Sequence, residues 1–194
     1  MEIWGIVVAA GIGRRFGGQK QFLELGGVPI WQRARDRLLE GGVHRVVLVG
    51  DVDGGVPGGE RRRDSVAAGL AHVPTGVEYV LVHDAARPNA SIRFVERVIA
   101  RLCDGDVDGV VPAIPVRDTL KEVSGEVVVG TRDRSDLIAV QTPQGFRRAA
   151  LLEAHSTIEG DASDDASMVE ATGGKIVWTE GDAGNLKLTY PDDL

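Results

Sequence analysis

Apolar, β-branched runs alternate along the chain with segments that have the periodicity of amphipathic helices. Runs that are apolar almost throughout, as in parallel strands covered on both faces, predict strands at residues 3–10, 44–50, 77–84 and 108–116. The intervening segments predict helices at residues 29–42, 64–73 and 91–105. Pro29 and Gly41 are helix start and stop signals, and Ser91 is a typical N-cap residue. This alternation predicts an α/β fold, a Rossmann-like, three-layer, doubly wound and mostly parallel sheet.

Residues 117–146 depart from this rhythm. Ser124 and Gly125 separate two β-prone runs, which predicts a hairpin. The pattern then predicts helices at 147–158 and 163–174 and strands at 175–181 and 185–190. The chain has no internal repeat or linker, so we expect one domain, residues 1–194, with residues 117–141 as a protruding β-hairpin arm. Because a lone two-stranded hairpin is marginally stable in water, we expect the arm to pack on the partner of a homodimer.

The composition is that of an ordinary globular domain, with 43% hydrophobic and 26% charged residues in a chain of 194. The net charge of −7 argues against a nucleic-acid partner, because nucleic-acid-binding domains are usually basic. No apolar run approaches the roughly 20 residues that span a bilayer, and the N-terminus lacks a signal-peptide pattern. We therefore expect no membrane partner and a cytoplasmic protein. The single cysteine excludes an intrachain disulfide and a cysteine metal cluster.

The stretch VVAAGIGRRFGGQKQF, residues 7–22, begins as a buried strand and ends as a loop of glycines and cations. It fails the dinucleotide fingerprint G-x-G-x-x-G, because Phe16 takes the place of the third glycine. It also fails the P-loop pattern, because Gln19 follows Gly18 where that pattern requires lysine. The loop still follows the first strand, where open α/β sheets bind their ligands, so we expect it to bind phosphates.

Small residues in this turn let the backbone approach a ligand and direct its N–H groups inward; they are Ala9, Ala10, Gly11 and Gly13. Arg15 and Lys20 can then reach a phosphate chain, the arginine as a fork and the lysine as a point charge. The alternative is a flexible surface loop whose cations are solvated.

Five motifs occur in order over essentially the whole chain: AAGIGRRFGGQKQFLELGGVPI (9–30), HDAARP (83–88), RDTLK (117–121), TPQGF (142–146) and NLKLTYPDDL (185–194). Together they resemble the 2-C-methyl-D-erythritol 4-phosphate cytidylyltransferase family of nucleotidyltransferases. The resemblance implies transfer of a cytidylyl group from CTP to a sugar-alcohol phosphate, 2-C-methyl-D-erythritol 4-phosphate. The products would be 4-diphosphocytidyl-2-C-methyl-D-erythritol, an intermediate of the non-mevalonate isoprenoid pathway, and pyrophosphate. Mg²⁺ or another divalent cation is the implied cofactor.

The resemblance also implies roles for individual residues. The catalytic cations at the phosphates would be Arg15, Lys20 and Lys187. The nucleotide would be bound by Ala9, Ala10, Gly11, Gly13, Gly59, Glu60, Ser65 and Ala85. At one of these positions Glu60 replaces the aspartate that is frequent in the family. The basic run from Arg61 to Arg63 is interpreted as a solvated approach to a helix rather than as part of the site.

The acceptor substrate would contact a second group of residues, Asp84, Arg87, Thr119, Arg134 and Thr142. Asp84 ends the third predicted strand and would also bind the metal ion. Arg134 and Thr142 would reach from the arm into the neighbouring subunit's pocket, so that the homodimer shares its active sites. A phosphate monoester has a second pKa near 6, so the nucleophile is already ionised at neutral pH and needs no general base. His83 is accordingly interpreted as structural.

Two alternatives remain open at this point. One is a ribitol-5-phosphate or related alditol-phosphate cytidylyltransferase of the same fold, although those enzymes tend to carry a bulkier residue in place of Ala86. The other is a nucleotide-binding module that keeps the fold without turnover. The joint presence of Arg15, Lys20, Asp84 and Lys187 argues against the second alternative.

Overall fold

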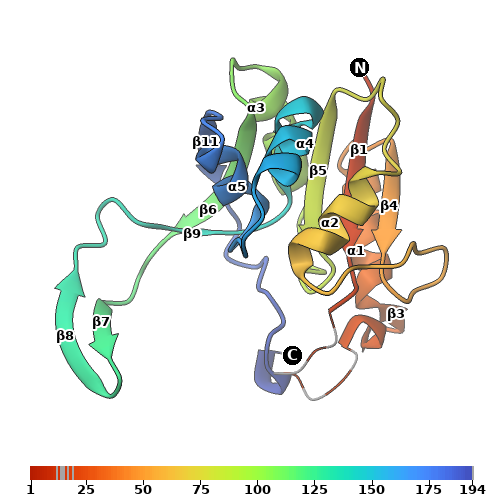
Figure 1. The fold of residues 1–194 in the computed structure, drawn as a ribbon. Coiled ribbons are helices and arrows are strands. Elements are labelled where there is room, and N and C mark those ends of the chain that lie inside the picture. Colours follow the sequence, from red (N-terminus) through yellow and green to blue (C-terminus); the bar gives the residue numbers. More distant parts are fainter. Residues whose placement is uncertain (12, 14–15, 17, 19, 194) are drawn as a thin grey trace.

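The computed structural model describes residues 1–194 except 12, 14–15, 17, 19 and 194 (Figure 1). In this part of the chain the main sheet has seven strands: β1 (Ile3–Val8), β4 (Arg45–Val49), β5 (Tyr79–Asp84), β6 (Gly109–Pro115), β9 (Ile138–Val140), β10 (Gln144–Arg147) and β11 (Ile176–Glu180). The order is β11-β6-β10-β5-β1-β4, and β9 extends the sheet beside β6. Pairs β4–β1, β1–β5 and β6–β11 are parallel, whereas β9 and β10 run antiparallel to their neighbours.

Helices cover both faces of this sheet. One apolar cluster joins the sheet to α1 (Ile30–Glu40) and α3 (Ile92–Cys103). A second cluster, on the opposite face, joins it to α2 (Arg62–Leu70), α4 (Arg148–Thr157) and α5 (Asp165–Ala171). Side chains of a strand alternate between faces, and Leu81 accordingly belongs to the first cluster and Val80 and Val82 to the second. Burial on both faces explains why the strands are apolar almost throughout, and the predicted three-layer α/β fold is confirmed.

Most predicted elements are present, but several details differ. Ser91 is at the N-cap of α3, but its side chain makes no capping hydrogen bond. Strand β9 and strand β10, which overlaps the TPQGF motif, were not predicted, because such short runs carry no clear strand signal of their own. Residues 185–190 were predicted as a strand, which is wrong, because their polar groups bond to loops instead of to a neighbouring strand. Leu188 N–H, for example, donates to the carbonyl oxygen of Ala86 at 2.8 Å.

The hairpin predicted around Gly125 is present as β7 (Leu120–Ser124) and β8 (Val127–Arg132). Gly125 has a φ of 59°, which favours glycine at the turn. Figure 1 shows this arm extending away from the body of the molecule. The side chains of Val127, Val128 and Val129 are all more than half exposed, which is unusual for consecutive valines.

The remaining elements are short. The loop after β1 leads into a 3-10 turn, η1 (Lys20–Phe22), and then into a two-stranded ribbon of β2 (Glu24–Leu25) and β3 (Val28–Pro29). A second 3-10 turn, η2 (Pro191–Asp193), lies near the C-terminus. In the part of the chain that is described, no helix combines the length and apolar character needed to cross a membrane.

Gly69 sets how closely α2 approaches the sheet. A Cβ atom at this position would lie 2.6 Å from Cγ2 of Ile6 and 2.8 Å from Cγ2 of Val49. Because both methyl groups belong to stiff β-branched side chains on buried strands, neither can move aside cheaply. Overpacking of a core typically costs about 1–3 kcal/mol and should outweigh the gain of about 1 kcal/mol in helix propensity.

We therefore expect Gly69→Ala to lower the free energy of unfolding, measured by urea titration. The matched control is Gly160→Ala, because a Cβ at Gly160 meets no atom within 4 Å. This control should change the free energy by less than about 0.5 kcal/mol. Equal stability of the two variants would contradict the close packing of α2.

Candidate active site

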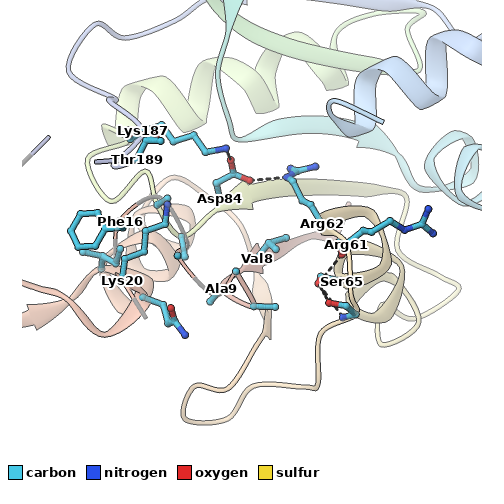
Figure 2. A pocket seen from close by; sticks show the side chains of 18 of the residues that line it. Val8, Ala9, Phe16, Lys20, Arg61, Arg62, Ser65, Asp84, Lys187 and Thr189 are labelled. Carbon is cyan, nitrogen blue, oxygen red and sulfur yellow. Dashed lines mark hydrogen bonds and ion pairs between the residues drawn. The ribbon is translucent and has the colours of Figure 1, made fainter. Parts of the chain in front are cut away.

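A cavity of about 680 Å³ lies at the carboxyl ends of β1 and β5 (Figure 2). Four segments line it: the loop after β1, residues 59–65, the turn after β5 and the C-terminal segment. It contains most of the residues predicted for the nucleotide and the phosphates, namely Ala9, Ala10, Gly11, Gly13, Lys20, Gly59, Glu60, Ser65, Ala85 and Lys187, together with Asp84, predicted for the acceptor and the metal ion. The tertiary structure thus brings together residues that are separated by more than 170 positions in sequence, at the edge where such sheets bind ligands.

Gly13 determines the turn that follows β1. Its φ is 63°, and a Cβ atom there would lie 1.8 Å from the carbonyl oxygen of Gly18. No other residue type fits, because the backbone conformation and the available space both exclude a side chain. At the end of this loop Lys20 Nζ donates to the carbonyl oxygen of Leu188 at 2.8 Å, which ties the loop to the C-terminal segment. Arg15, the other predicted catalytic cation of the loop, lies outside the described residues.

Residues 58–65 pack against the turn through small residues. A Cβ atom at Gly58 would lie 2.4 Å from Cβ of Ala10, so the two loops meet only because both residues are small. Ser65 is buried, and its hydroxyl accepts a hydrogen bond from the backbone N–H of Gly59 at 3.1 Å. The Ser65 hydroxyl therefore holds the segment that carries Gly59 and Glu60 along one wall of the cavity.

Asp84 is the central charged group of the cavity. Its Oδ2 accepts from Lys187 Nζ at 2.7 Å, and its Oδ1 accepts from Arg62 Nε at 3.0 Å (Figure 2). Burial by itself raises the pKa of the Asp84 carboxyl, but the charges of Arg62 and Lys187 outweigh that effect and hold the pKa well below its ordinary value. Asp84 is therefore an ionised carboxylate at neutral pH.

Arg62 is a site residue that sequence reasoning missed. The basic run from Arg61 to Arg63 was interpreted as solvated, which holds only in part. Arg61 makes exposed ion pairs with Asp64 and Asp161, as expected of a surface residue. Arg61 and Arg62 both line the cavity, but only Arg62 pairs with two buried carboxylates, Asp84 and Asp165. No local signal could have identified it, because its partners lie 22 and 103 residues away in the sequence.

His83 and Thr142 hold the end of β5 in place. The His83 side chain is completely buried, and burial lowers its pKa to about 4, so the ring is neutral at neutral pH. Nε2 lies 3.0 Å from the carbonyl oxygen of Arg87 and must donate to it, which leaves Nδ1 to accept from the Thr142 hydroxyl at 2.9 Å. The Thr142 oxygen in turn accepts from Asp84 N–H at 3.1 Å. His83 is structural, as predicted from the sequence.

Four of the residues predicted for the acceptor substrate do not line this cavity. Thr142 is buried beside Asp84, and its hydroxyl oxygen accepts from the backbone N–H of Asp84 at 3.1 Å. Arg87 donates to the carbonyl oxygen of Asn185 at 2.7 Å and so fixes the C-terminal segment. Thr119 and Arg134 are exposed and belong to the arm, where Arg134 donates to the carbonyl oxygen of Arg117.

The acidic groups suit a metal ion that is held mainly by its substrate. Within the described residues, no cluster of three or more histidine, cysteine, aspartate or glutamate side chains could hold a metal ion. Mg²⁺ is usually bound through one or two carboxylates together with substrate phosphates and waters. The ionised carboxylate of Asp84, at the wall of a cavity with two lysines, fits that mode of binding.

With this fold and this site, the chain falls in the class of α/β proteins that have the Rossmann-like nucleotidyltransferase fold. The family model for 2-C-methyl-D-erythritol 4-phosphate cytidylyltransferase (IspD) matches residues 3–194. The chain belongs to this family.

Individual relatives and structures agree with that assignment. The 2-C-methyl-D-erythritol 4-phosphate cytidylyltransferase of Carboxydothermus hydrogenoformans is 39% identical, over 100% of this chain and 93% of its own length. The bifunctional enzyme IspD/IspF of Nitratidesulfovibrio vulgaris is 41% identical, but the chain spans only 57% of its length. The crystal structure of the Thermus thermophilus 2-C-methyl-D-erythritol 4-phosphate cytidylyltransferase has a TM-score of 0.80 and 35% identity and covers 100% of this chain and 95% of that one.

The buried His83 ring predicts a loss of stability in mild acid. Its pKa falls from an ordinary value of 6.5 to about 4 on folding, so between these values the unfolded chain binds a proton that the folded chain does not. Stability should therefore decrease as the pH falls through this window, by up to about 3 kcal/mol in total.

We expect His83→Asn to be less stable than the wild type at neutral pH but to lose less further stability on acidification. Urea titrations between about pH 7 and pH 5, above the range where carboxylates protonate, measure this slope. His72→Asn, which changes an exposed histidine, is the control and should keep the wild-type slope. An unchanged slope in His83→Asn would show that another group causes the acid sensitivity.

Proposed function

We propose that this protein transfers a cytidylyl group from CTP to 2-C-methyl-D-erythritol 4-phosphate, with release of pyrophosphate. The observation that carries the proposal is the convergence of Lys20, Asp84 and Lys187 on one cavity at the strand ends. Membership of the cytidylyltransferase family supplies the identity of the two substrates.

The nucleotide occupies the side of the cavity formed by the two small-residue segments. Ala10, Gly11 and Gly13 line the cavity, where their small size lets the backbone approach the triphosphate, and Lys20 lies at the end of this loop. Gly59, Glu60 and Ser65 lie on the adjacent wall, where backbone groups can read the edge of the cytosine ring. Ala85, which is buried and has a small side chain, lets the ribose approach the end of β5.

The reaction needs charge stabilisation rather than proton transfer. An ionised oxygen of the acceptor's phosphate attacks the α-phosphorus of CTP, forming a new P–O bond. The bond from that phosphorus to the oxygen bridging to the β-phosphorus breaks, and pyrophosphate leaves with the electron pair. No proton moves in this step. This agrees with the cavity, because its described lining includes cations and no histidine. Lys20 and Lys187 offset the charge that develops on the phosphate oxygens in the transition state.

Asp84 is the residue that would bind Mg²⁺. The ion, when bound, neutralises charge on the phosphates and on the leaving pyrophosphate. Asp84 also holds Lys187 through a 2.7 Å hydrogen bond, so the same carboxylate positions one of the cations for the phosphates.

We further propose a homodimer in which the arm completes the neighbour's site. The exposed run Val127–Val129 gives the arm an apolar surface, whose exposure to water is unfavourable. A two-fold dimer covers such a surface reciprocally, once on each subunit. Thr119 and Arg134, which do not line their own subunit's cavity, would then contact the acceptor's phosphate in the other subunit.

The first test is a coupled pyrophosphate-release assay with 2-C-methyl-D-erythritol 4-phosphate and each of CTP, UTP, ATP and GTP. CTP should be preferred to ATP and GTP by orders of magnitude, because a wrong base leaves hydrogen-bonding groups of the site unpaired. Equal use of ATP would contradict the cytidylyl assignment and leave the fold unaffected. Turnover with D-ribitol 5-phosphate that exceeds turnover with 2-C-methyl-D-erythritol 4-phosphate would identify an alditol-phosphate enzyme instead.

The second test is subunit complementation for the shared site. Lys20→Ala and Arg134→Ala subunits should each be nearly inactive, because removal of one electrostatic donor typically costs about 10²–10³ in kcat. A mixture should regain part of the activity, since each heterodimer contains one cavity with both residues intact. The control is a mixture of two preparations of the same variant, which should stay inactive. Absence of recovery after verified subunit exchange, or an active monomer in sedimentation, would overturn the shared site.

A further inference from the structure

Arg62 connects the cavity to the helical layer behind it. From α2, its Nε donates to Oδ1 of Asp84 at 3.0 Å and its Nη1 donates to Oδ2 of Asp165 at 2.7 Å. The Asp84 carboxylate is in the cavity wall, whereas Asp165 on α5 is completely buried. One planar guanidinium thus bridges a carboxylate that faces the substrates and a carboxylate inside the protein.

Asp165 is in turn held from α4. Its second oxygen, Oδ1, lies 3.0 Å from Nε2 of His155, whose side chain is only 4% exposed. Burial raises the pKa of the Asp165 carboxyl, but the hydrogen bond from His155 and the charge of Arg62 lower it below its ordinary value. A carboxylate can only accept, so His155 carries its proton on Nε2 and donates. Both oxygens of Asp165 are therefore occupied, and the residue cannot rotate away from Arg62 without breaking two bonds.

Stability alone does not explain these charges. A buried ion pair contributes little compared with apolar side chains of the same volume, because desolvation offsets the attraction between the charges. The three helices that supply the charges already share an apolar cluster, which includes Val66 of α2, Leu151 of α4 and Val169 of α5. The series His155–Asp165–Arg62 ends on one oxygen of Asp84, and that end point lies in the active-site cavity (Figure 2).

We propose that Arg62 is a positioning residue of the active site and that the buried Asp165–His155 pair locks it in place. Arg62 holds Oδ1 of Asp84 so that the opposite oxygen, Oδ2, points to Lys187 and to the phosphates. Lysine cannot replace it, because an ammonium group is a point charge without the planar geometry that bridges two carboxylates. This inference deepens the proposed cytidylyl transfer and rests on it.

The test compares steady-state kinetics of the wild type, Arg62→Lys, Asp165→Asn and the double variant, with CTP and 2-C-methyl-D-erythritol 4-phosphate. Each single variant should lower kcat by about 10–100-fold, the loss expected when a positioned group shifts by about 1 Å. The KM for CTP should change by less than about threefold, since the nucleotide's own contacts are intact. The double variant should be no slower than the slower single variant, because both changes release the same carboxylate.

The matched control is Arg63→Met. Arg63 follows Arg62 on α2, donates to the carbonyl oxygens of Gly160 and His155 at 2.7 and 3.3 Å, and does not line the cavity. Its loss should reduce stability in urea titration while kcat stays near the wild-type value. Urea titration of every variant separates slow turnover from incomplete folding. If Arg62→Lys does not fold, Asp165→Asn, which conserves the shape of the side chain, tests the positioning role in its place.

The outcomes separate the two proposals. If the wild type is active and the folded Arg62→Lys and Asp165→Asn variants keep a normal kcat, the positioning role is overturned and the proposed function is not. Additive losses in the double variant, or an equal loss of kcat in Arg63→Met, would also overturn it, because either result indicates a general effect on packing. Absence of pyrophosphate release by the wild type would overturn the proposed function, and the positioning role with it.

Discussion

The burial of one negative charge, that of Asp84, is the constraint on which the site depends. A carboxylate at the end of a buried strand is stable only when cations compensate its lost hydration, and here Lys187 and Arg62 do so from opposite sides. These partners come from the C-terminal segment and from α2, so compensation of one charge joins three distant parts of the chain. The residues that neutralise Asp84 therefore also build the walls of the cavity.

The same requirement explains the form of the C-terminal segment. Residues 185–190 have the apolar alternation of a strand, yet they form none, and Lys187 bonds to Asp84. Asn185 donates to the carbonyl oxygen of Thr142 at 2.9 Å, and Leu188 bonds to Ala86, so the irregular path is held at both sides of Lys187. Lys20 bonds to the carbonyl oxygen of Leu188, which links this path to the loop after β1.

The arm carries predicted site residues that lie away from the cavity. The body of the molecule positions the residues that line the cavity, whereas Thr119 and Arg134 flank the β7–β8 hairpin. Figure 1 shows that this hairpin extends away from the body. An exposed apolar run on such a hairpin agrees with the proposed dimer, in which specificity for the acceptor comes from a neighbouring chain. In that dimer, Lys20 of one subunit and Arg134 of the other would act in the same site.

Sequence by itself determined the elements whose cause is local. Strands β1, β4, β5 and β6 follow from unbroken apolar runs, because only burial on both faces permits them, and Gly125 marks the hairpin turn through its φ. The motifs also identified most of the residues that line the cavity, including Lys20, Asp84 and Lys187. Tertiary structure alone decided the antiparallel insertion of β10, the irregular path of residues 185–190 and the pairing of Arg62 with Asp84 and Asp165. Each of these depends on hydrogen-bonding or ionic partners that are remote in sequence, and such partners leave no periodic pattern around the residues that they hold.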